Sequence, residues 1–255
     1  MGHEYNIFRN GMLGMPYGDI AQLRKRDIAA IGVPLDVGFG ARRGTDEAPD
    51  ALRRMSLRDP SAMKPSGLDL GNLNPSVGWD SRLNAVIREL QGIDAVPLVL
   101  GGDQRVGMVL AQAMPGCHVV AMLPKIVPDL VDRQAGCRWL GLNGAQDAAT
   151  WQALKAAGSH WRTARNLDSV PTGFDGPEGD FIFWLDLSVI DLGHAAGSIG
   201  LNPGGMTPET LVRCVAALGG TPKAMVITGL APSLDTRGIS ELAAIEAILS
   251  LTRNE

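Results

Sequence analysis

The sequence has few cysteines and no long apolar run. Its three cysteines, Cys117, Cys137 and Cys214, are odd in number and lack CxxC spacing, a pattern that indicates neither a disulfide framework nor a zinc site. They are typical of small buried residues in a reducing cytoplasm. No segment holds 18 uninterrupted apolar residues, and the N-terminus has no basic region followed by an apolar one. We therefore expect a soluble, cytoplasmic protein with no membrane partner.

The chain also lacks an excess of positive charge. It has 23 Lys and Arg residues against 27 Asp and Glu residues, which gives a net charge of -4. Because the basic residues are scattered along the chain, nucleic acid is not an expected partner. The 255 residues, 45% of them hydrophobic, can bury a large core. We expect one domain over residues 27–255, preceded by an N-terminal arm, residues 1–26, that lies on the surface or on a neighbouring subunit.

Short apolar strands alternate with amphipathic helices along this domain. The expected strands are 28–33, 96–100, 118–123, 181–186 and 223–227. The expected helices are 45–55, 81–90, 106–113, 148–157, 207–218 and 240–251. Proline and glycine interrupt residues 124–145, which we expect to be irregular, and 166–180 is an expected polar loop. This alternation predicts an α/β fold whose mostly parallel sheet carries helices on both faces.

Two expected strands end beside a carboxylate. Asp186 closes the strand 181–186, and Asp103 follows the strand 96–100 after two glycines. The carboxyl ends of parallel strands are where α/β enzymes place their sites. Asp186 and Asp191 are also explained as structural residues that accept backbone N–H groups. His194, three residues after Asp191, leaves a single-metal site open as a weaker alternative.

A dinucleotide site is excluded on spacing. Gly38, Gly40 and Gly44 form GxGxxxG rather than GxGxxG, and no helix opens on the third glycine.

Four segments resemble the ureohydrolase family, to which arginase and agmatinase belong. They are RRGTDEAPDALR at 42–53, GGDQR at 101–105, LDLSVIDLGHAAGSIGLNPGGMT at 185–207 and GLAPSLD at 229–235. The family motifs read roughly RxGxxxGPxxxR, GGDHS, SxDxDxxDPxxxPGxGxPxPGGL and VExNPxxD, in the same order. The resemblance implies a three-layer α/β/α sandwich. In active members of the family, two Mn or Ni ions at the strand ends hold the hydroxide that attacks a guanidino carbon.

The same resemblance implies that most metal ligands are missing here. The six positions that carry them in the family, called the vestigial metal positions below, fall on Gln104, Leu123, Lys125, Val127, Asp186 and Ser188. Leucine and valine have no donor atom and an ammonium group repels a cation, so a dinuclear centre is physically implausible. The substrate-binding glutamate of the family falls on Gly229. We expect no catalytic residue, no metal and no cofactor in this chain.

Lys125 suggests how a buried carboxylate that has no metal ion beside it could be neutralised. If it lies where the family has a histidine ligand, its ammonium group could pair with Asp186 or Asp103. This hypothesis predicts a pocket closed by a salt bridge and apolar side chains.

Three functions follow from these observations. The first is a non-catalytic subunit that assembles with an active ureohydrolase paralogue in a trimer- or hexamer-based hetero-oligomer, the partner holding Mn or Ni. Heteromeric guanidine and biguanide hydrolases such as metformin hydrolase are the family precedent. The second is a small-molecule sensor or binding module that uses the old pocket. The third is a remodelled hydrolase that works without the dinuclear centre.

Overall fold

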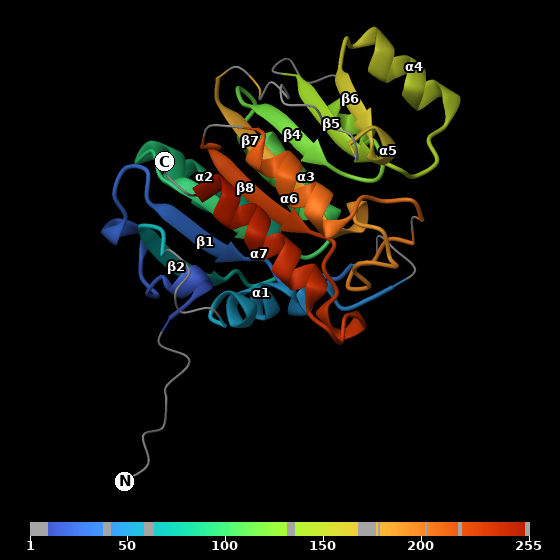
Figure 1. The fold of residues 1–255 in the computed structure, drawn as a ribbon. Coiled ribbons are helices and arrows are strands. Elements are labelled where there is room, and N and C mark those ends of the chain that lie inside the picture. Colours follow the sequence, from blue (N-terminus) through green and yellow to red (C-terminus); the bar gives the residue numbers. More distant parts are fainter. Residues whose placement is uncertain are drawn as a thin grey trace.

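The chain folds around one parallel β-sheet (Figure 1). The computed structural model describes residues 10–37, 42–58, 64–131, 136–167, 177, 179–201, 203–218 and 221–252. Within them the sheet has eight strands in the order β2-β1-β3-β8-β7-β4-β5-β6, and every neighbouring pair is parallel. The strands are β1 (Ile28–Gly32), β2 (Gly67–Asn72), β3 (Val96–Leu100), β4 (His118–Met122), β5 (Cys137–Leu142), β6 (His160–Thr163), β7 (Phe181–Asp186) and β8 (Ala224–Thr228).

Helices cover both faces of this sheet (Figure 1). They are α1 (Ala48–Ser56), α2 (Trp79–Gly92), α3 (Gln104–Ala113), α4 (Ala148–Ala156), α5 (Ala164–Leu167), α6 (Pro208–Ala216) and α7 (Ile239–Thr252). Strand β7 shows why both faces must be covered, because successive side chains point to opposite sides of a strand. Phe183 joins the apolar cluster under α1, α6 and α7, whereas Trp184 joins the cluster under α2 and α3. The predicted three-layer α/β/α sandwich is confirmed.

The strands that sequence analysis missed are β2 and β6, at the two edges of the sheet, and β5. The expectation that residues 124–145 are irregular is wrong, because β5 lies within them. Its glycine is part of the strand: Gly141 has φ +83° and lies where the β5–β6 register shifts. A Cβ there would lie 2.4 Å from Val189 Cγ2, so this glycine permits close packing rather than ending the strand. Gly38 and Gly40 of the excluded motif, and most of the expected loop 166–180, lie outside the described residues.

The expected N-terminal arm is partly incorporated into the domain. Met12, Leu13 and Met15 are buried and belong to the apolar cluster under α1 and α7. The apolar side chains of this segment are therefore part of the core. Residues 1–9 lie outside the described part of the chain.

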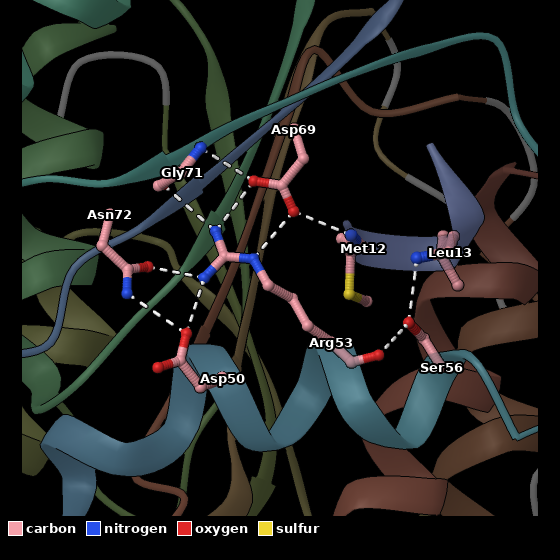
Figure 2. Close-up of polar contacts among 8 residues, drawn as sticks. All are labelled: Met12, Leu13, Asp50, Arg53, Ser56, Asp69, Gly71 and Asn72. Atoms are coloured by element: carbon pink, nitrogen blue, oxygen red, sulfur yellow. Dashed lines mark hydrogen bonds and ion pairs between the residues drawn. The ribbon is translucent and has the colours of Figure 1, made fainter. Parts of the chain in front are cut away.

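A buried ion pair holds this segment in place (Figure 2). Arg53 on α1 donates to Asp69 on β2 from Nε at 2.7 Å and from Nη2 at 2.8 Å. Asp69 also accepts the backbone N–H of Met12 at 2.7 Å, and Ser56 accepts that of Leu13 at 2.9 Å. Asp69 is fully buried and Arg53 is 6% exposed. One fork of charged hydrogen bonds thus connects α1, β2 and the N-terminal segment.

Replacing Arg53 is expected to destabilise the fold strongly. Arg53→Met leaves the Asp69 carboxylate buried without its cation, which costs about 3–5 kcal/mol of unfolding free energy. Guanidinium denaturation measures this loss. The matched control is Arg54→Met, because Arg54 is the exposed neighbour on the same helix, and its effect should stay within about 0.5 kcal/mol. Equal effects of the two substitutions would contradict this role of Arg53.

Candidate functional site at the carboxyl end of the sheet

The strand ends that the motifs mark meet at one edge of the sheet. Strands β3, β8, β7 and β4 are consecutive neighbours. Their carboxyl ends bring together Asp103, Gly229, Asp186 and Leu123, which come from four separate segments of the sequence. In an open parallel sheet this edge is where ligands bind.

Asp186 is held by neutral hydrogen-bond donors. It is 1% exposed, and it accepts the Ser188 N–H at Oδ1 and the Thr228 hydroxyl at Oδ2, each at 2.9 Å. The Thr228 hydroxyl oxygen in turn accepts the Trp184 indole N–H at 2.9 Å. Burial raises the pKa of Asp186, and the nearby Asp103 adds to that effect, against the opposing effect of these hydrogen bonds. The site therefore favours the neutral acid more than water does.

Asp103 is neutralised by a cation, but that cation is not Lys125. Arg105 donates to Asp103 from Nη2 at 3.0 Å and from Nε at 3.2 Å. The carboxylate also caps α3 by accepting the Arg105 backbone N–H at 3.0 Å.

Lys125 is exposed, and within the described residues it forms no ion pair with Asp186 or Asp103. The proposed Lys125 salt bridge is therefore corrected. Asp103 already has Arg105, and Asp186 has the Thr228 hydroxyl.

The remaining vestigial metal positions offer little for a cation. Leu123 is fully buried in the apolar cluster under α2 and α3, and Val127 packs against that cluster. Gln104 begins α3, and the Ser188 hydroxyl oxygen accepts the Gly200 N–H at 3.1 Å. In the part of the chain that the structure describes, no three His, Cys, Asp or Glu side chains are grouped so that they could hold a metal ion. The donor set of these residues does not fit a pair of Mn or Ni ions.

Gly229 and Asp186 occupy adjoining space. Gly229 has φ +74°, and a Cβ at this position would lie 2.4 Å from Asp186 Oδ1. A glutamate at position 229 could not be accommodated without moving the Asp186 carboxyl group. The glycine and the buried acid are thus structurally dependent on each other.

A pocket of about 980 Å³ opens beside these residues. It lies between the first turn of α2, α3 and the segments that follow β4 and β7. Asp186 and Ser188 line it together with Gln104, Lys125 and Val127. The expected closure of the pocket by a salt bridge and apolar side chains is therefore not found.

Sequence reasoning assigned some neighbouring residues correctly and missed others. Asp191 accepts the backbone N–H groups of Gly193 at 2.8 Å and Gly204 at 2.7 Å, as its structural interpretation predicts. Thr228 and Arg105, the partners of the two buried acids, were not predicted. Arg105 directly follows the GGDQ letters and Thr228 ends an apolar strand, but neither position alone indicates which acid the side chain reaches.

Comparison with known proteins agrees with this geometry. The arginase-family model matches residues 26–123, less than half of the chain. A hypothetical agmatinase from Burkholderia thailandensis has 19% identity and a TM-score of 0.78, with coverage of 95% of this chain and 89% of that one. Proclavaminate amidino hydrolase from Streptomyces clavuligerus has 19% identity and a TM-score of 0.76, with coverage of 95% of both chains. Formimidoylglutamase from Bacillus subtilis has 20% identity and a TM-score of 0.75, with coverage of 96% and 92%.

These likenesses define the class of fold. The chain has the arginase-family, or ureohydrolase, fold. No helix among the described residues is long and apolar enough to cross a membrane.

A side chain at position 229 is expected to disturb the buried acid. Gly229→Ala places an alanine in the left-handed conformation and brings its Cβ into contact with Asp186. An alanine strained by φ alone costs about 1–2 kcal/mol of unfolding free energy. The loss for Gly229→Ala should therefore exceed this value. Gly204→Ala is the matched control, since Gly204 has φ +78° and a Cβ there would meet no atom within 4 Å. Thermal or chemical denaturation compares the two. Equal losses would contradict the dependence between Gly229 and Asp186.

Proposed function

We propose that this chain is a ureohydrolase-family member without a catalytic centre of its own, and that it serves as a non-catalytic subunit of an active ureohydrolase. The observation that carries the proposal is that the fold of the family is present while side chains able to bind a metal ion are few. The chain has the fold of the family, while Leu123 and Val127 present only hydrocarbon at the carboxyl edge of the sheet.

The environment of Asp186 supports the same conclusion. A carboxylate that ligates a dication must be ionised, and its ligating oxygen must face the ion. Here Asp186 is 1% exposed, and each of its oxygens accepts a hydrogen bond from the protein. The Ser188 hydroxyl and the Asp186 carboxyl group both line the pocket, but the Ser188 oxygen accepts the Gly200 N–H and Asp186 is 1% exposed, so this pair is not arranged to activate a water molecule. The third alternative, a remodelled hydrolase, therefore has no observation in its favour.

Apolar side chains on loops at this end of the sheet are available for a partner. Val77 is 99% exposed, Leu201 57% and Val37 55%. They follow β2, β7 and β1 respectively, so they surround the edge at which an active relative would process its substrate. Exposed apolar groups that gather on one end of a protein mark contact surfaces. In the proposed complex the paralogue binds Mn or Ni and hydrolyses a guanidino-type C–N bond, and this chain contributes contacts.

Co-expression with an active ureohydrolase from the same cell tests the proposal. A tag on this chain is expected to recover both subunits, and release of urea from guanidino substrates by the partner should be lost or strongly reduced when this chain is omitted. Leu201→Asp should weaken recovery of the partner by about tenfold or more, because it places a charge in an apolar contact. Ile93→Asp is the control, since Ile93 is a 36% exposed apolar residue at the other end of α2. A stable homo-oligomer that recovers no ureohydrolase, or urea release by this chain alone, would contradict the proposal.

A further inference from the structure

The pocket at the carboxyl end of the sheet has the size and lining of a small-molecule site. Its volume of about 980 Å³ is at the upper end of the range typical of ligand pockets, about 300–1,000 Å³. Trp79 from α2, Met108 and Val109 from α3, and Ile126 after β4 supply apolar surface. A pocket with this lining can take an organic ligand with an apolar body.

The deep end of the pocket carries little negative charge. Asp186 is 1% exposed and both of its oxygens accept hydrogen bonds from the protein, and Asp103 behind it is paired with Arg105. The other acids that line the pocket, Asp80 and Asp129, are exposed to water, so their charges are well screened. Nothing in this arrangement offers a desolvated carboxylate to a guanidinium group. Gly229, which lies where the family has its substrate-binding glutamate, has no side chain that could do so.

Lys125 supplies a positive charge, and its hydrocarbon chain packs against the protein. A Cβ on Gly144 would lie 2.6 Å from Lys125 Cγ and 2.7 Å from Cε, so the lysine hydrocarbon lies directly on this glycine. Lys125 lines the pocket and is exposed, and in the described part of the chain its ammonium group has no carboxylate within ion-pair distance. An ammonium group held beside an apolar cavity is suited to an anionic headgroup.

We infer that this pocket binds a small organic carboxylate, whose anionic group contacts Lys125 and whose apolar body lies against Trp79, Met108 and Ile126. This inference goes beyond the proposed role as a non-catalytic subunit and does not depend on it, because every residue of the site belongs to this chain. A ligand so bound would be chemically opposite in charge to a guanidino substrate. It would make the chain a ligand-responsive subunit rather than a purely structural one.

Isothermal titration of the purified full-length chain tests the inference with three probes that share an alkyl body: hexanoate, hexylguanidinium and hexanol. Hexanoate is expected to bind saturably and about tenfold or more tightly than the other two, since only it can form an ion pair with Lys125. Lys125→Met should weaken hexanoate binding by about tenfold, and Lys125→Arg should largely retain it. Lys155→Met is the matched control, because Lys155 is an exposed lysine on α4 outside this pocket.

A second variant places the binding in the pocket. Met108→Trp fills the cavity and should weaken hexanoate binding independently of charge. The inference is overturned if hexylguanidinium binds as tightly as hexanoate, if Lys125→Met and Lys155→Met have equal effects, or if hexanoate shows no saturable binding at millimolar concentration. These results come from the isolated chain, so they are distinguishable from failure to recover a ureohydrolase partner.

Discussion

The carboxyl group of Asp186 lies at the end of a central strand, where water cannot solvate it. A buried acid must be paired, ligated to a metal or hydrogen-bonded as it stands. In this chain Thr228, on the neighbouring strand β8, donates its hydroxyl to Asp186 and accepts the Trp184 indole N–H. Gly229 leaves room for the carboxyl oxygen. The centre of the sheet edge thus carries a network of neutral hydrogen bonds.

The loops at this end of the sheet are held together by backbone hydrogen bonds. The loop after β7 remains tied to the residues after β8, because Ile199 donates its N–H to the Gly229 carbonyl oxygen at 3.1 Å and Ala231 donates to that of Gly197 at 2.8 Å. Shape at this end of the molecule is therefore maintained by backbone contacts that need no metal. Loops that keep their shape in this way can contact a partner and hold a ligand, which are the two roles proposed above.

The sequence predicted the architecture well because the buried strands β3, β7 and β8 are continuous apolar runs, and the helices between them have clear caps and periodicity. It failed at β5, where Gly141 resembles a break but is a packing position, and at the short edge strands. The burial of Met12 and Met15 could not be predicted, since they show no periodicity and are buried only through tertiary contacts. At the site, residue types alone indicate that Leu123 and Val127 have no donor atom. The partner of each acid could not be predicted, because Arg105 and Thr228 are selected by side-chain geometry that no spacing rule specifies.

The central claim is that the donor set at this sheet edge no longer binds a pair of catalytic metal ions. The most direct test incubates the purified chain with Mn²⁺ or Ni²⁺, removes free ions by desalting and measures the retained metal by mass spectrometry. The account predicts that the chain retains no more metal than its Asp186→Asn variant, because Asp186 is already satisfied by protein donors. Retention of two ions per chain that disappears in Asp186→Asn would contradict it.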